Sequence, residues 1–181
     1  MNFPNLITIG RILLVPLTIW LLISEEFAAA FFIFVIAGIS DGVDGYLALV
    51  TKSQTELGAY LDPIADKALL VSVFATLGLV KILPAWLVLI VITRDILIVG
   101  GVLLAWLIGQ PFTMKPLWIS KLNTVAQIAF VGLVLGALGL NIEAHMLLKA
   151  GSFIVAGFTL VSGAFYLRDW VKHMGHSGDK A

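Results

Sequence analysis

The chain has 181 residues, of which 60% are hydrophobic and 12% are charged, and its formal net charge is zero. A mean hydropathy of +1.06 excludes an ordinary soluble domain and indicates an integral membrane protein. Zero net charge gives no support for binding nucleic acid, and the absence of cysteine excludes disulfides and cysteine-based metal sites or nucleophiles.

Six apolar stretches follow one another along the chain and predict six membrane-spanning helices, because one span needs about 20 apolar residues. They cover roughly residues 6–23, 27–47, 60–80, 85–108, 118–140 and 146–167. The sequence therefore predicts an all-α integral membrane domain, a single six-helix bundle over residues 1–167, followed by a polar tail over 168–181 that frays. The first residues lack a basic region and a cleavage site, so we expect a retained span and not a signal peptide.

The lysines and arginines predict the orientation of these spans. With six spans, both termini lie on the same side as the second-to-third and fourth-to-fifth connections. The opposite side carries Lys81 and Lys149, whereas the side of the termini carries Lys52, Lys67, Lys115, Lys121, Arg168, Lys172 and Lys180. The positive-inside rule therefore predicts that both termini are cytoplasmic.

Four aspartates gather at the end of the second stretch and the start of the third. Asp41 and Asp44 are three residues apart and Asp62 and Asp66 are four apart, so on helices each pair shares one face. Neighbouring carboxylates repel one another unless a cation lies between them, and an all-oxygen ligand set favours Mg²⁺ or Mn²⁺ over zinc. Two such ions about 4 Å apart could clamp a diphosphate. The structural alternative, helix capping, explains Asp62 before Pro63 but not four aspartates at these spacings.

This stretch resembles the signature of the CDP-alcohol phosphatidyltransferases, D-x2-D-G-x2-A-R-x8-G-x3-D-x3-D. The matching positions are Asp41, Asp44, Gly45, Ala48, Gly58, Asp62 and Asp66. One position departs, because Leu49 stands where the family has an arginine. The departure removes a cation expected near the phosphates of the nucleotide or near the carboxylates. Lys52, one turn later, is a candidate to replace it.

The resemblance implies a metal-dependent transfer of the phosphatidyl group of CDP-diacylglycerol to an acceptor hydroxyl, with release of CMP. It implies that Asp41, Asp44 and Asp62 hold two ions, and that Asp66 lies near the second ion and takes the proton of the acceptor. The residues expected to line the CDP moiety are Gly45, Ala48, Gly58 and Lys52. The resemblance also implies a homodimer in a bacterial or mitochondrial inner membrane, with the site on the cytoplasmic-equivalent face.

Arg94 lies beside Asp95 inside an apolar stretch, where a cation facing lipid would be costly. Two interpretations stay open: an interhelical ion pair that serves stability, or a site for the phosphate of the acceptor. Further candidates for that phosphate site are Lys115, Ser120, Lys121 and Arg11. The lysines are also what the positive-inside rule alone predicts, and Arg11 is close enough to the start of its span to snorkel to the interface.

The identity of the acceptor rests on two short runs, KPLWISKLNTVAQI and ITRDILIVGG. They resemble eukaryotic-type cardiolipin synthases, which favours phosphatidylglycerol as acceptor and cardiolipin as product, with glycerol 3-phosphate as the alternative. Two other classes stay open: a CDP-lipid binder without catalysis, because of Leu49, and a small proton-coupled transporter. Aspartate-rich membrane prenyltransferases resemble a bundle of about nine spans, for which this chain is too short.

Overall fold

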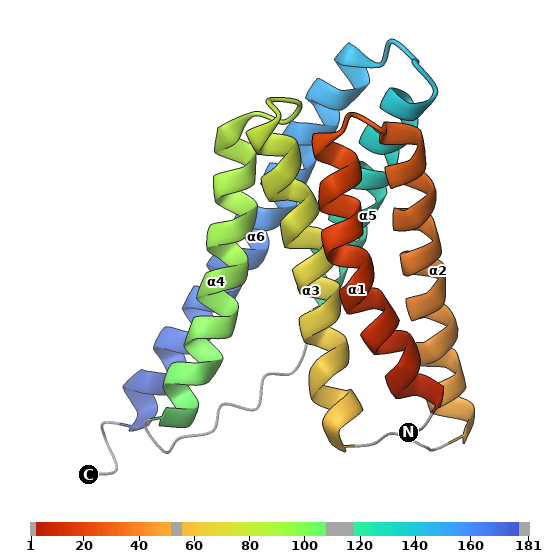
Figure 1. Cartoon of the computed structure of the whole chain (residues 1–181). Helices are drawn as coiled ribbons and strands as arrows, with labels where there is room; N and C mark the ends of the chain where they lie inside the picture. The colour runs from red at the N-terminus through yellow and green to blue at the C-terminus, as the bar shows by residue number, and fades with distance from the viewer. Residues whose placement is uncertain (1–2, 52–55, 108–117, 178–181) are drawn as a thin grey trace. The chain divides into compact units, whose positions relative to one another are not determined.

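The computed structural model describes residues 3–51, 56–107 and 118–177, with side chains for residues 10, 13–40, 67–101 and 118–171. Every element among these residues is an α-helix, which confirms the all-α expectation, and one helix corresponds to each predicted apolar stretch (Figure 1). The helices are α1 (Phe3–Ile23), α2 (Phe27–Thr51), α3 (Glu56–Leu79), α4 (Ala85–Leu107), α5 (Trp118–Gly139) and α6 (His145–Ser177).

Three helix ends differ from the predicted ones by four residues or more. α2 continues to Thr51 and α3 begins at Glu56, so both helices extend farther into the connection between them than the apolar pattern predicts. α6 continues past Leu167 to Ser177, so the prediction of a frayed tail from residue 168 was wrong for most of that tail. No proline interrupts this segment, and Arg168 lies 5.3 Å from the ring centroid of Phe165 on the preceding turn.

The chain divides into two compact units. The first, called here the α1–α3 unit, comprises Met1–Leu83 and Val131–His145. The second, called the α4–α6 unit, comprises Pro84–Phe130 and Met146–Ala181. A single six-helix bundle therefore stays a prediction.

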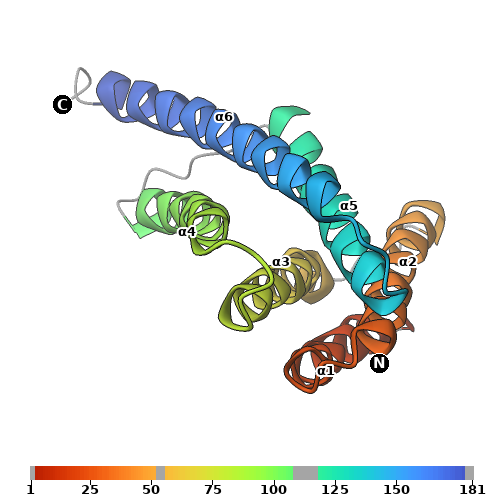
Figure 2. The same ribbon diagram turned by 90° about the horizontal axis from the view of Figure 1, so that it is seen from above.

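In the α1–α3 unit, α1 packs against both α2 and α3, which border it in Figures 1 and 2. The core face of α3 carries Leu70, Val73, Phe74 and Leu77, each no more than 6% exposed. Their spacing of three and four residues places them on one side of the helix. This apolar stripe accounts for the position of α3 in the unit.

The second half of α5 belongs to the same unit and lies close to α2. A Cβ added to Gly139 would be 2.8 Å from the Cα of Ala28, and one added to Gly136 would be 3.3 Å from the ring of Phe31. Small residues let two helix backbones approach this closely. These two glycines therefore serve a contact within one chain.

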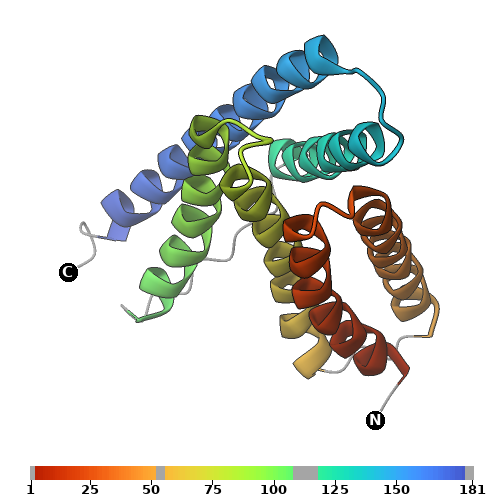
Figure 3. The ribbon, with the colours of Figure 1, turned by 45° about the horizontal axis from the view of Figure 1, so that its top comes forward.

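In the α4–α6 unit, α4 and α6 run side by side in the same direction (Figure 3). Arg94 of α4 bonds to Ser162 of α6, and the carbonyl of Ile98 accepts from the hydroxyl of Tyr166 at 3.1 Å. The partners in both pairs are 68 residues apart. A constant offset of this kind means that the two helices are parallel and in fixed register.

The first half of α5 runs antiparallel to α6. Asn123 contacts Thr159, whereas Phe130, farther along α5, faces Gly151, nearer the start of α6. A Cβ added to Gly151 would be 2.7 Å from the ring of Phe130. The α4–α6 unit therefore brings three helices together at the level of Ser120 and Ser162.

Three short turns end α1, α3 and α5 in the same way. Glu25, Lys81 and Asn141 have positive φ angles of 60°, 62° and 53°. Each donates its N–H to the carbonyl three residues back, and the following residue donates to the carbonyl five residues back, over 2.8–3.3 Å. This is the Schellman pattern, which satisfies carbonyl groups that a helix end otherwise leaves unpaired.

Among the described residues, two stretches are both long enough and apolar enough to cross a bilayer, Trp118–Gly139 and His145–Val171. Shorter apolar stretches in α1, α2 and α3 are Leu13–Ile23, Phe27–Ser40 and Lys67–Leu79. The number of spans and the side on which the termini lie stay predictions.

Candidate functional site

The aspartate motif lies at the end of one helix and the start of the next. Asp41 and Asp44 are on the last turns of α2, and Asp62 and Asp66 are on the first turns of α3. The helical backbone gives each pair the shared face that its spacing predicts. The side chains of these aspartates, of Gly45, Ala48, Leu49 and Gly58, and all of Lys52 lie outside the described residues.

The side chains that the structure does describe offer no competing metal site. Among them, no three histidine, aspartate or glutamate residues are grouped so as to hold a metal ion. Ser40, next to Asp41, donates its hydroxyl to the carbonyl of Ile36 at 2.8 Å and so bonds within its own helix. The four aspartates stay a predicted ligand set, and their oxygen chemistry suits Mg²⁺ or Mn²⁺.

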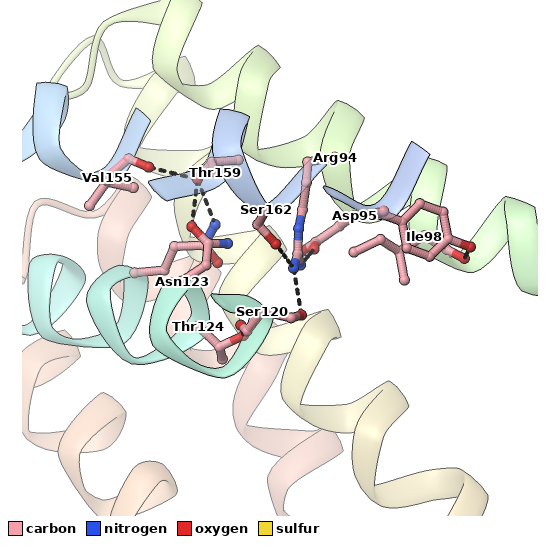
Figure 4. A network of polar contacts seen from close by, with 11 residues as sticks. Arg94, Asp95, Ile98, Ser120, Asn123, Thr124, Val155, Thr159 and Ser162 are labelled. Atoms are coloured by element: carbon pink, nitrogen blue, oxygen red, sulfur yellow. Dashed lines mark hydrogen bonds and ion pairs between the residues drawn. The ribbon is translucent and has the colours of Figure 1, made fainter. Parts of the chain in front are cut away.

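A second polar site lies where α4, α5 and α6 meet, and Arg94 is at its centre (Figure 4). Arg94 is 4% exposed, and its Nη1 donates to Oδ1 of Asp95 at 2.7 Å. Its Nη2 donates to the hydroxyls of Ser120 on α5 and Ser162 on α6, both at 2.7 Å. The ion pair therefore lies within α4 and is not interhelical, and the two serines make the links between helices.

These contacts explain how a cation can be buried among apolar helices. A buried charge without a partner is strongly destabilising, by about 3–5 kcal/mol when one member of a pair is removed. Asp95, itself 5% exposed, offsets the charge of Arg94, and the serine hydroxyls accept two further N–H groups. One buried donor, Nε of Arg94, has no hydrogen-bond partner among the described residues.

A neighbouring cluster of uncharged polar groups joins α5 to α6. Asn123 and Gln127 are at most 1% exposed, and Nε2 of Gln127 donates to Oγ1 of Thr159 at 3.3 Å. The Thr159 hydroxyl lies 2.9 Å from Oδ1 of Asn123 and 2.7 Å from the carbonyl of Val155, either of which can accept its hydrogen. Bonds of this kind between apolar helices contribute about 0.6–2 kcal/mol each.

The residues predicted from the sequence did not include Ser162, Thr159, Asn123 and Gln127, although their spacing carries a signal. Polar residues on α5 recur at Ser120, Asn123 and Gln127, three and four residues apart, within an otherwise apolar stretch. Thr159 and Ser162 repeat the pattern on α6. Polar residues at helical spacing inside an apolar helix indicate a face that meets another polar face.

The remaining predicted acceptor residues are placed differently. The structure brings Arg94 and Ser120 into contact but leaves Lys121 exposed, with its Nζ 5.9 Å from the ring centroid of Trp118. The side chain of Arg11 and all of Lys115 lie outside the described residues.

Comparison with known proteins matches residues 1–164 to the sequence pattern that defines the CDP-alcohol phosphatidyltransferases. A protein of Drosophila melanogaster named probable cardiolipin synthase (CMP-forming) is 32% identical over 180 residues, which cover 91% of this chain and 56% of that protein. A rice protein (Oryza sativa subsp. japonica) named chloroplastic CDP-diacylglycerol–glycerol-3-phosphate 3-phosphatidyltransferase 1 is 33% identical over 92% of this chain and 56% of its own length.

A bacterial relative is closer to this chain in length. The Bacillus subtilis protein named CDP-diacylglycerol–glycerol-3-phosphate 3-phosphatidyltransferase is 29% identical over 186 residues, which cover 93% of this chain and 95% of that protein. This chain thus spans about half the length of the Drosophila and rice relatives and nearly all of the Bacillus one.

Proposed function

Because the chain belongs to the CDP-alcohol phosphatidyltransferase family, we propose that it transfers the phosphatidyl group of CDP-diacylglycerol to an acceptor hydroxyl and releases CMP. The observation that carries the proposal is the motif from Asp41 to Asp66, which keeps the family spacing apart from Leu49. In support, both aspartate pairs lie on helices, where their spacing gives each a common face.

The donor chemistry of the motif suits divalent cations. Asp41, Asp44 and Asp62, with Asp66 close to the second ion, would hold two Mg²⁺ or Mn²⁺ ions. When bound, such ions neutralise charge on the diphosphate and on the departing CMP. The small residues Gly45, Ala48 and Gly58 would let the nucleotide approach the helix backbone, and Lys52 would supply the cation that Leu49 does not.

Asp66 is proposed as the general base. It takes the proton of the acceptor hydroxyl, whose oxygen forms a bond to the lipid-side phosphorus. The bond between that phosphorus and the bridging oxygen breaks, and CMP leaves with the electron pair. Because neighbouring cations favour the ionised carboxylate, the effectiveness of this base depends on its position beside the acceptor.

Phosphatidylglycerol is the acceptor we favour, with cardiolipin as product. The runs around Arg94 and Ser120 support this choice, as does the name of the Drosophila relative. The proposed surroundings of the acceptor phosphate are Arg94, Lys115, Ser120, Lys121 and Arg11. Glycerol 3-phosphate is the second candidate, because the Bacillus relative that matches nearly end to end is named for it.

We further propose six membrane spans, with the termini and the site on the cytoplasmic-equivalent face of a bacterial or mitochondrial inner membrane, in a homodimer. The shortest helix, α1, has 21 residues. At about 1.5 Å per residue it is about 30 Å long, which matches the hydrocarbon core of a bilayer.

The test replaces Asp66 by asparagine, which keeps the size of the side chain but removes its ability to take a proton. We expect Asp66→Asn to lower CMP release at least a hundredfold while CDP-diacylglycerol binding is retained, because general-base catalysis contributes about 10²–10⁴-fold. CMP release would be measured on the purified full chain with Mg²⁺ or Mn²⁺, and binding by calorimetry. The matched control is Asp169→Asn, an aspartate on α6 that pairs with Arg168 at 3.3 Å, outside the motif.

Separate reactions would contain phosphatidylglycerol, glycerol 3-phosphate or no acceptor, and Leu49→Arg would be assayed alongside. Cardiolipin formed only with phosphatidylglycerol supports the favoured acceptor, whereas dependence on glycerol 3-phosphate replaces it and keeps the reaction. Near-normal turnover of Asp66→Asn rejects the assignment of the base. No CMP release from the unaltered chain or from Leu49→Arg under any condition rejects the proposed reaction.

A further inference from the structure

We infer that Arg94 is a positioning residue: its guanidinium holds the first turn of α5 against α4 and α6, and it affects the acceptor only through that turn. This inference rests on the proposed function, in which the start of α5 lies beside the acceptor. It departs from the simpler reading of Arg94 as a direct ligand of the acceptor phosphate.

The hydrogen bonds of the guanidinium argue against direct phosphate binding. Arginine recognises a phosphate best through two parallel N–H groups, and each of its two forks, Nη1 with Nη2 and Nε with Nη2, includes Nη2. Both hydrogens of Nη2 are donated to Ser120 and Ser162. A phosphate could bind in a fork only after one of these bonds was broken. Asp95 also offsets the charge that would attract it.

The packing around Arg94 keeps the side chain in this position. Its exposed fraction is 4%, and a Cβ added to Gly163 of α6 would lie 3.6 Å from its Cγ. Gly163 therefore lies beside the stem of the side chain, with room for a methyl group between them. The guanidinium is held in place by its burial and by its bonds to Ser120 and Ser162.

What Arg94 holds is the start of α5. Ser120 is in the first turn of this helix, which begins at Trp118, and the exposed Lys121 follows it. Farther along α5, the contact of Asn123 with Thr159 aligns α5 with α6. The hydroxyls of Ser120 on α5 and Ser162 on α6 can then both accept from Nη2 of Arg94. Removing a serine hydroxyl should therefore loosen the turn that carries Lys121.

The two roles of Arg94 predict opposite kinetic effects for Ser162→Ala. This change frees one hydrogen of Nη2. If Arg94 bound the acceptor phosphate directly, the acceptor would therefore bind as well as before or better. A positioning residue would lose an anchor, and the KM for the acceptor should rise on the order of tenfold, since a hydrogen bond to a charged group contributes about that factor. We expect the kcat and the KM for CDP-diacylglycerol to stay within about twofold. Ser120→Ala should behave in the same way.

The control is Thr124→Val, which removes a hydroxyl on α5 that bonds within its own helix, to the carbonyl of Ser120 at 3.1 Å. We expect it to leave all three kinetic constants unchanged. An acceptor KM that is unchanged or lower in Ser162→Ala overturns the inference, as does an equal rise in Thr124→Val.

A second measurement does not depend on activity. The natural chain has no cysteine, so a spin label can be attached at Leu122→Cys, an exposed position two residues after Ser120. We expect the label to become more mobile in Ser120→Ala but not in Thr124→Val, and unchanged mobility in Ser120→Ala overturns the inference. If the unaltered chain released no CMP with any acceptor, the proposed function would fail, and label mobility would still decide whether Arg94 holds this turn.

Discussion

The separation of α4 and α6 depends on one residue without a side chain. A Cβ added to Gly101 would collide with the hydroxyl of Tyr166 and lie 3.2 Å from its Cε1. That hydroxyl donates to the carbonyl of Ile98, and Tyr166 is 6% exposed, so the ring has little room to move. The neighbouring Gly100 has no atom within 4 Å of such a Cβ.

We therefore expect Gly101→Ala to lower the free energy of unfolding by about 1–3 kcal/mol, the cost of forcing an extra carbon into a packed interface. Gly100→Ala, the matched control, should be neutral or slightly stabilising, because alanine favours a helix. Thermal unfolding in detergent measures both. Adding Tyr166→Phe to Gly101→Ala should recover part of the loss by removing the colliding oxygen, and no recovery would show that the collision is not the cause.

The centre of the polar site shows what the sequence could and could not supply at this scale. An arginine inside an apolar stretch is conspicuous, and grouping it with Ser120 led to a pair that is in contact. Ser162 is less conspicuous, because a serine between valine and glycine is common in apolar helices, and only its spacing from Thr159 marks it. Its role follows from a register of 68 residues between α4 and α6, which only the packed structure supplies.

At the scale of elements, the three helix ends with positive φ differ in how well their residues suit that conformation. Asparagine adopts the left-handed region readily, whereas a longer side chain such as that of Lys81 is strained there. Lys81 is exposed, so its side chain has no packing role to lose.

Lys81→Gly should thus raise the free energy of unfolding by about 0.5–1 kcal/mol, a shift in Tm of about 1–4 °C for a chain of this size. Lys81→Ala removes the same charge but keeps the strained backbone, so we expect no gain from it. Asn141→Gly should give a smaller increase than Lys81→Gly. Equal Tm values for the glycine and alanine variants at position 81 would contradict the role of backbone strain.

The accuracy of each predicted helix end depends on how clearly the residue pattern changes there. Charged residues, glycines and prolines between the apolar stretches predicted that α2, α4 and α5 begin at Phe27, Ala85 and Trp118, as they do. The sequence was least informative from Leu47 to Tyr60, because the polar run from Thr51 to Glu56 interrupts the apolar pattern by which a helix is recognised. The end of α6 was missed because a polar helix end has no apolar periodicity.

At the scale of the whole molecule, the proposed six spans make a prediction about sidedness. The turns at Glu25, Lys81 and Asn141 each follow an odd-numbered helix. With six spans, all three lie on one face of the membrane and the two termini on the other. The two stretches that are long and apolar enough to cross a bilayer, Trp118–Gly139 and His145–Val171, lie on either side of the turn at Asn141.

Single cysteines at positions 25, 141 and 181 would test this in sealed vesicles with a membrane-impermeant maleimide, since the natural chain has none. We expect Glu25→Cys and Asn141→Cys to react from the same side and Ala181→Cys from the opposite side. Labelling positions 25 and 141 from different sides would rule out six spans. Detergent-opened vesicles, in which all three must react, provide the control.

The contacts of Arg94 also limit how this sequence can change over evolutionary time. Loss of the arginine alone would take the Arg94 cation away from a buried Asp95, and loss of either serine would leave a guanidinium hydrogen without its acceptor. Each single step lowers stability, so drift at these positions requires compensated changes. In relatives with an apolar residue at position 94, position 162 should therefore vary freely.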